Sequence, residues 1–356
     1  MYKSEDKHLF TNYRPISLTS TFVKIVEKIV VKQMMAYMKK HRMIYDHQYG
    51  FPPGHNTTQP MIHFLEKFYS AFNHTSPKLV AAVFIDLKKA FDTVDHDILL
   101  KKLEFYGFRG AVNTWFRNFL GGREQYVFYR GKNSKKRTIS CGVPQGTCLG
   151  PILFLIFIND LANATDLFTI LFADDTTFLY EFNDLITSAV IINRELTRAA
   201  EWFQANKLTL NTKKTKFMLF SRKKIPNSSF PLFTLKIGNE TIERIGSQSS
   251  VKSFKFVGHH IDDQLSWDFH IKYVTQKISK GCFALATTKK IIPLKIRQTI
   301  YNCLVRPYLE FGLVIWGGAK KKLIDSVIKK QKIVFAILPY AVPCRVTYYI
   351  SKIFSI

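Results

Sequence analysis

The sequence predicts an α+β domain, and three segments carry this prediction. Residues 79–87 are apolar except for Asp86 near their end, a pattern typical of a strand that is covered on both faces. Residues 167–172 and 176–180 are β-rich runs on either side of Ala173-Asp174-Asp175, which predicts a hairpin. Residues 185–205 have helical periodicity, so strands and helices alternate along the chain.

The N-terminal part is expected to be mainly helical. Residues 16–40 carry apolar side chains at roughly helical spacing with lysines between them, which predicts a basic amphipathic helix. Residues 48–59 contain two glycines and two prolines and are expected to form a loop. Two more helical patterns follow the first strand, at about 96–106 and 111–119.

A second hairpin is expected after these helices. Its predicted strands, residues 125–130 and 136–141, flank a turn at 131–134. The apolar run that follows predicts a buried helix at about 150–161, because it is far too short to cross a membrane. Two further short strands are expected, at 208–210 and 217–220.

The composition changes after Ser221, where Lys, Ser, Pro and Gly become frequent, and this change marks a candidate domain boundary. The C-terminal third is then expected to be mainly helical, with helices at 267–288, 293–305 and 320–338. Trp267 and Trp316 lie in or near these segments. Each of them either packs in the core or stacks on nucleic-acid bases.

The chain is strongly basic, with 52 Lys and Arg against 26 Asp and Glu, a formal net charge of +26. Because the excess is spread along the chain, we expect a polyanionic partner, either nucleic acid or an anionic membrane surface. No motif supports a membrane partner. Basic clusters such as residues 132–137 either follow a nucleic-acid backbone or are solvated faces.

The five cysteines have no paired spacing, so neither a zinc site nor a disulfide framework is predicted. The N-terminal residues are charged and lack the apolar core of a secretory signal. We therefore expect an intracellular protein, located in the nucleus, the cytoplasm or both.

Three carboxylates are placed at the ends of predicted strands, namely Asp86, Asp174 and Asp175. Adjacent strands would bring them together, and clustered carboxylates suit the two Mg²⁺ ions of phosphoryl transfer. An Asp-Asp pair in a hairpin is also common in a plain β-turn. The pair alone therefore does not establish a catalytic site.

Several short motifs occur in a fixed order over about residues 3–335. They are Asn12-Tyr13-Arg14-Pro15-Ile16-Ser17-Leu18, Gln48-Tyr49-Gly50-Phe51, Gly54-His55-Asn56-Thr57, Phe84-Ile85-Asp86-Leu87-Lys88-Lys89-Ala90-Phe91-Asp92, Gly142-Val143-Pro144-Gln145-Gly146, Phe172-Ala173-Asp174-Asp175, Leu210-Asn211 with Lys214-Thr215, and Phe256-Val257-Gly258. In this order they resemble the reverse transcriptases of LINE-type (non-LTR) retrotransposons, particularly the jockey-like elements of arthropods.

The resemblance implies a right-hand polymerase. Residues 1–78 are expected to be N-terminally truncated fingers, and 79–255 a palm with an antiparallel sheet and part of the fingers. Residues 256–356 are expected to be a mostly helical thumb with a C-terminal extension. The implied reaction adds deoxynucleoside triphosphates to the 3′-hydroxyl of a DNA primer on an RNA template, with two Mg²⁺ ions as cofactors.

The resemblance also implies roles for the acids and for one lysine. Asp86, Asp174 and Asp175 would be catalytic and would bind the metal ions. Lys214 would protonate the leaving pyrophosphate. A bland basic strand edge is the alternative for Lys214, because lysines stand on both sides of it.

Four residues would bind the nucleotide. Arg14 would bind the triphosphate, since a planar guanidinium suits phosphate oxygens, and Lys88 either faces the triphosphate or is a solvated lysine. Phe91 would be the steric gate that excludes a ribose 2′-hydroxyl, or else a core aromatic. Gln145 would contact the templating base and the nucleotide, unless its Gly- and Pro-constrained loop only leads into the following helix.

The sequence departs from the family pattern in two places. Pro52 stands where the family usually carries an arginine, and the chain starts inside the first motif. An upstream fingers segment and an endonuclease are therefore expected from the parent polyprotein. The alternative function is a truncated, catalytically inactive relic that binds RNA or DNA.

Overall fold

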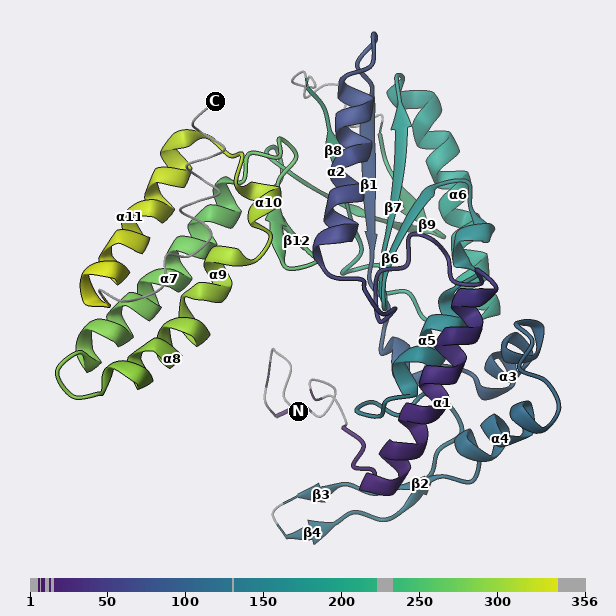
Figure 1. The fold of residues 1–356 in the computed structure, drawn as a ribbon. Helices are drawn as coiled ribbons and strands as arrows, with labels where there is room; N and C mark the ends of the chain where they lie inside the picture. The colour runs from purple at the N-terminus through teal and green to yellow at the C-terminus, as the bar shows by residue number, and fades with distance from the viewer. Residues whose placement is uncertain are drawn as a thin grey trace. The chain divides into compact units, whose positions relative to one another are not determined.

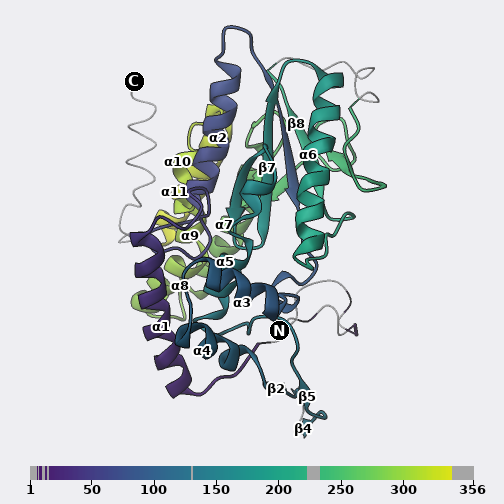
Figure 2. The same cartoon turned by 90° about the vertical axis from the view of Figure 1, so that its right-hand side faces the viewer.

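The computed structural model describes residues 6, 8, 9, 13, 16–129, 131–222 and 233–338. The chain forms two compact units, which are considered separately below. The first unit is drawn from residues 1–56, 74–217 and 224–243, and the second from 57–73, 218–223 and 244–356. Figures 1 and 2 show the elements in two views. The sequence boundaries at 78 and 255 stay predictions.

A central antiparallel sheet organises the first unit. Strand β1 (Leu79–Ile85) pairs with β7 (Asp175–Phe182) from Leu79↔Phe182 to Ile85↔Thr176, and β7 forms a hairpin with β6 (Phe168–Phe172). Val80 to Ile85 are all buried, as predicted for a strand covered on both faces. The predicted α+β class with an antiparallel sheet is confirmed.

The whole sheet has five strands in the order β11-β8-β1-β7-β6. The two additional strands, β8 (Lys216–Phe220) and β11 (Glu243–Ile245), each contain residues of both units. The predicted strand at 208–210 is wrong. Those residues form only an isolated bridge, Leu87↔Leu210.

The helices of the first unit begin at the polar residues that cap them. Ser20, Asp95 and Asp184 each accept a hydrogen bond from a backbone N–H in the first turn, and these caps start the three helices α1 (Thr21–Lys40), α3 (His96–Phe105) and α6 (Leu185–Ala205). The cap at Ser20 explains why α1 begins at Thr21 and not at the predicted residue 16. Figures 1 and 2 both show α6 running along the sheet.

Helix α5 (Gly150–Ile158) is the buried apolar helix that the sequence predicts, and α4 (Ala111–Leu120) lies earlier in the chain. Glu27 of α1 is buried, and its carboxylate accepts hydrogen bonds from the backbone N–H groups of Cys148 and Leu149 at the start of α5. Among the helices that the structure describes, none is long and apolar enough to cross a membrane.

The hairpin after α4 differs from its prediction. Strand β2 (Glu124–Gln125) pairs with β5 (Arg137–Thr138), and β3 (Phe128–Tyr129) pairs with β4 (Lys132–Asn133). Lys132 and Asn133 therefore belong to a strand, so the predicted turn at 131–134 is wrong. Because Tyr129 pairs with Lys132, the turn is only two residues long.

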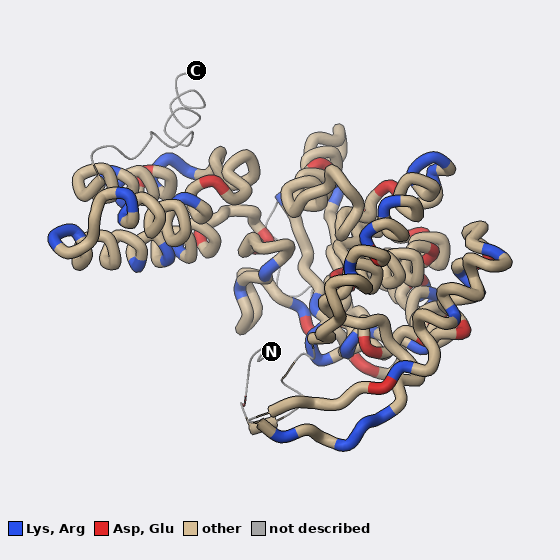
Figure 3. The backbone as a smooth tube through the Cα atoms, turned by 60° about the horizontal axis from the view of Figure 1, so that its bottom comes forward, with Lys and Arg blue, Asp and Glu red and all other residues tan. Residues whose placement is uncertain are grey.

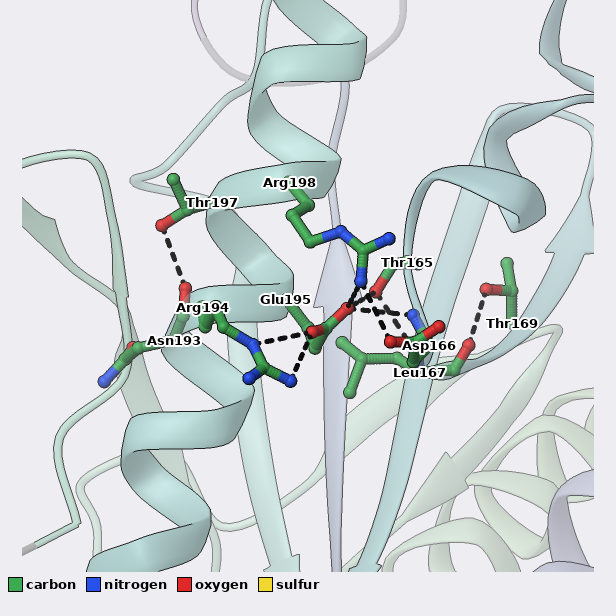
Figure 4. Close-up of polar contacts among 9 residues, drawn as sticks. All are labelled: Thr165, Asp166, Leu167, Thr169, Asn193, Arg194, Glu195, Thr197 and Arg198. Carbon is green, nitrogen blue, oxygen red and sulfur yellow. Dashed lines mark hydrogen bonds and ion pairs between the residues drawn. The ribbon is translucent and has the colours of Figure 1, made fainter.

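A buried carboxylate ties α6 to the segment before β6 (Figure 4). Glu195 is 1% exposed and accepts hydrogen bonds from the Asp166 N–H and the Thr165 hydroxyl, while Arg194 and Arg198 pair with it at 2.9–3.0 Å. Burial raises the pKa of Glu195, but these donors lower it more, so the net pKa shift is downward. The carboxylate stays ionised as a structural anchor.

The second unit contains most of the C-terminal helices and one helix that the sequence analysis did not predict, α2 (Thr58–Phe72). Its other elements are a short hairpin and five helices: β12 (Phe254–Phe256), β13 (His259–Ile261), α7 (Asp268–Thr288), α8 (Leu294–Leu304), α9 (Arg306–Glu310), α10 (Leu313–Trp316) and α11 (Lys321–Ile337). Trp267 and Trp316 are 5% and 0% exposed, so both pack in the core. The mainly helical character of this region is confirmed.

Candidate active site

The register of the sheet brings the three predicted acids to one end of it. Phe172 pairs with Asp175 and closes the hairpin, so Ala173 and Asp174 form its two-residue turn. Asp86 follows directly after Ile85, whose partner is Thr176. Continued by one residue, the same register places Asp86 opposite Asp175. The two strands thus bring together carboxylates that are far apart in sequence.

Asp86 is held by a segment that the sequence analysis quoted as a motif without giving most of it a role. The side-chain amide of Asn211 donates to Asp86 Oδ2 at 2.7 Å, and the backbone N–H of Asn211 donates to the Asp86 carbonyl oxygen at 2.8 Å. The hydroxyl of buried Thr215 accepts from the Asp86 N–H at 3.2 Å. Asn211 and Thr215 therefore fix both the backbone and the carboxylate of Asp86.

The turn that carries Asp174 is braced by a second segment, residues 47–50. Gln48 is completely buried, and its Oε1 accepts hydrogen bonds from the N–H groups of Gly50 at 2.9 Å and Ala173 at 3.4 Å. Leu171 exchanges backbone hydrogen bonds with the same segment. A Cβ at Gly50 would lie 2.2 Å from the Ala173 nitrogen, so only glycine permits this approach.

The brace makes a prediction for Gln48→Leu. Leucine has a similar volume but accepts no hydrogen bond, so the two N–H groups lose their acceptor in a buried place. We expect the free energy of unfolding to fall by about 2 kcal/mol and the catalytic rate of any reaction at Asp174 to fall by about tenfold or more. Urea unfolding and steady-state kinetics measure the two effects.

Gln33→Leu is the matched control, because Gln33 is exposed on α1. Equal stability and equal rates for Gln48→Leu and Gln33→Leu would show that the brace does not act on the turn.

The loop containing Gln145 lies against the segment that follows Asp86. The N–H groups of Gly142 and Val143 donate to the carbonyl oxygens of Val94 and Phe91 at 2.7 and 2.8 Å. Gln145 Nε2 donates to Asp92 Oδ1 at 2.8 Å. The structure thus brings Gln145 close to the short 3-10 helix Ala90–Asp92, which contains Phe91.

Phe91 is half-buried in this arrangement. Its ring stacks on Phe154 of α5, with centroids 4.4 Å apart and an interplanar angle of 25°. Phe51, in the loop that contains Pro52, packs edge-on against the other side, at 6.2 Å. The ring is therefore held in one orientation while part of it stays accessible.

The remaining predicted residues lie around this centre or outside the described residues. Lys88 is exposed two positions after Asp86, and its backbone N–H donates to Thr209 at 2.8 Å. Lys214 is exposed within the segment that holds Asp86. Lys216 is instead paired with Glu243. Arg14 lies outside the described residues.

Among the described residues, no three His, Cys, Asp or Glu side chains form a cluster that could hold a metal ion by themselves. The assignment of all three acids to metal binding stays a prediction. A smaller donor set, with at most two of these carboxylates supplemented by substrate oxygens, is the arrangement that Mg²⁺ usually takes with nucleotides.

Comparison with known proteins identifies the family. The model of the family described as "Reverse transcriptase (RNA-dependent DNA polymerase)" matches residues 3–261. The probable RNA-directed DNA polymerase from transposon BS of Drosophila melanogaster is 30% identical over 328 residues, covering 89% of this chain and 35% of the relative. The RNA-directed DNA polymerase from mobile element jockey of the same species is 26% identical over 328 residues, covering 89% and 34%.

The chain spans about a third of the length of these curated relatives. A telomerase structure from Candida albicans aligns with 93% of the chain and 58% of its own at 12% identity and a TM-score of 0.49. The relatives confirm the predicted resemblance to jockey-like elements. With a family model matching most of its length, this chain belongs to the reverse transcriptase (RNA-dependent DNA polymerase) family.

Proposed function

We propose that the chain is the RNA-directed DNA polymerase domain of a non-LTR retrotransposon protein. The observation that supports this most strongly is the meeting of Asp86 with the Ala173-Asp174-Asp175 turn at adjacent strand ends, in a chain of the reverse transcriptase family. In the proposed reaction, the 3′-hydroxyl of a DNA primer attacks the α-phosphate of a deoxynucleoside triphosphate, and pyrophosphate leaves. An RNA strand is the template.

The carboxylates suit a hard divalent cation. Asp86 uses Oδ2 for Asn211, which leaves a carboxylate oxygen available, and Asp174 and Asp175 lie beside it. Two Mg²⁺ ions held by these acids with phosphate oxygens and water would activate the primer hydroxyl and neutralise charge on the triphosphate. Reverse transcriptases as a family generally depend on divalent metal ions.

The other side chains position the reactants. Asn211 and Gln48 keep the two acidic strand ends in place through the hydrogen bonds described above. Gln145, oriented by Asp92, contacts the templating base and the incoming nucleotide. Arg14 and Lys88 bind the triphosphate, and Lys214 supplies a proton to the leaving pyrophosphate.

Phe91 sets the choice of sugar in this proposal. Because Phe154 and Phe51 fix the orientation of its ring, a ribose 2′-hydroxyl cannot displace it. For Phe91→Val we expect the ratio of kcat/KM for dCTP over CTP to fall by about tenfold or more. Single-nucleotide incorporation opposite a template guanine measures this ratio. An unchanged ratio in an active variant would leave Phe91 as a core aromatic only.

Primer extension tests the proposed function. The chain is incubated with a DNA primer annealed to an RNA template, four deoxynucleoside triphosphates and Mg²⁺. We expect stepwise extension that EDTA abolishes and added Mg²⁺ restores. Salt-sensitive template binding without any extension would instead support the inactive relic. A contribution from an upstream segment or an endonuclease, and a nuclear or cytoplasmic location, stay predictions.

A further inference from the structure

Four consecutive large side chains are exposed on the hairpin that follows α4. Tyr126, Val127, Phe128 and Tyr129 have exposed fractions of 53%, 67%, 69% and 66%. We call residues 123–138, which contain β2 to β5, the aromatic hairpin. It is a narrow two-stranded ribbon that extends away from the helices beside it (Figures 1 and 3).

Such exposure costs free energy in a protein that stays alone. Most large apolar side chains on soluble proteins are at least partly covered, and contiguous apolar patches usually mark an interaction surface. A two-stranded hairpin is also only marginally stable in water, so these residues contribute little to holding it together. A binding partner would explain why aromatic side chains occupy its tip.

The charges of the aromatic hairpin indicate what kind of partner it fits. Its described residues include five basic side chains and one acid: Arg123, Lys132, Lys135, Lys136, Arg137 and Glu124. Only Lys136 forms an ion pair with that acid, at 3.5 Å between exposed groups. The surface is therefore both aromatic and cationic. It is complementary to a ligand that presents flat apolar faces together with negative charge.

The pairing of the strands combines the two properties on one face. Tyr129 and Lys132 are cross-strand partners, so their side chains lie on the same face of the ribbon. Phe128, paired with Asn133, lies on the opposite face. A ring and an ammonium group side by side match one base and its phosphate in a single nucleotide unit.

We propose that the aromatic hairpin binds an unpaired nucleic-acid strand, with bases stacked on its rings and phosphates near its lysines. A base in a duplex already stacks on its neighbours, so a duplex offers the rings no free face. A second copy of this chain would bring the same positive charge. If the proposed function is correct, the strand is the single-stranded part of the RNA template.

Fluorescence anisotropy with the full chain tests the proposal, using a labelled unstructured RNA and a labelled duplex of equal length at several salt concentrations. The variant Tyr126→Ala/Phe128→Ala/Tyr129→Ala is expected to bind the single strand about tenfold or more weakly, with an unchanged salt dependence. The variant Lys132→Ala/Lys135→Ala is expected to reduce the slope of log K against log salt by about one unit.

Two controls separate binding from folding. Phe105→Ala removes an aromatic ring that is 80% exposed on α3 beside Glu104, away from any basic cluster of the hairpin, and should bind as the wild type does. Tyr126→Phe/Tyr129→Phe keeps the rings and should also retain wild-type affinity. Circular dichroism confirms that each variant has the wild-type helix content.

Three outcomes would overturn the proposal. They are wild-type affinity of the triple alanine variant for the single strand, an equal loss of affinity for the duplex, and a loss of self-association or of anionic-vesicle binding in place of RNA binding. The test is independent of catalysis, because Asp174→Asn should bind the strand normally. A chain that binds through the hairpin but never extends a primer would refute the proposed function alone.

Discussion

Replacing Asp174 with asparagine is expected to lower the rate of primer extension by about a thousandfold or more, equivalent to about 4 kcal/mol of activation free energy. Asparagine has nearly the same shape but no negative charge, so it is a poor ligand for Mg²⁺. Because Asp174 lies in a two-residue turn at the end of the sheet, the substitution should leave the fold intact. Single-turnover incorporation of one nucleotide measures the rate.

Binding and folding must be measured in parallel. Asp174→Asn should bind the primer–template with unchanged affinity and unfold at the wild-type urea concentration. Glu201→Gln is the matched control, since Glu201 is an exposed acid on α6, and it should extend primers at the wild-type rate. Wild-type extension by Asp174→Asn would remove the acid pair from the mechanism.

The second unit is expected to lose several kcal/mol of stability on acidification from pH 7 to pH 5, about 2 kcal/mol for each of two buried histidines. His259 and His270 are 0% and 1% exposed, with ring centroids 5.1 Å apart. Burial lowers the pKa of His259 to about 4 and that of His270 to about 3, and neighbouring histidines lower both further.

The sign follows from where each form takes up protons. Above pH 6.5 both histidines are neutral in the folded and the unfolded chain, so their stabilising effect is fully present. Between pH 6.5 and about pH 4 the unfolded chain binds protons that the folded chain does not, so stability falls with pH. Urea unfolding followed by the fluorescence of Trp267 and Trp316 measures this loss.

The variant His270→Asn separates this effect from general acid denaturation. The Asn side-chain oxygen can replace His270 Nδ1, which accepts from the His260 N–H at 3.3 Å, but it does not titrate. We expect the variant to lose about 2 kcal/mol less than the wild type between pH 7 and pH 5. An identical loss in both proteins would mean that His270 is not responsible.

The sequence predicts the elements around the active site well because their patterns are local. The apolar run before Asp86 and the β-rich runs around Asp174 suffice to predict three paired strands. The hydrogen bonds that hold the acids are not local. Gln48 reaches Ala173, and Asn211 reaches Asp86, across more than a hundred residues. No periodicity or composition reveals such contacts.

Two errors have physical causes. The tight turn of the aromatic hairpin uses Gly131 at a φ of +79°, so pairing extends closer to the tip than a four-residue turn allows. Helix α2 follows a loop with two prolines, and its own Pro60 lies in the first turn, where proline is tolerated in a helix. The roles of Arg14 and Lys214 came from the resemblance alone.

Template-directed incorporation tests the central claim most directly. The chain is given a DNA primer on an RNA template with one position changed from adenine to guanine, and the first nucleotide added is identified. Addition of thymidine monophosphate opposite adenine and of deoxycytidine monophosphate opposite guanine is the predicted result. No incorporation by the folded chain, or the same nucleotide added on both templates, would contradict it.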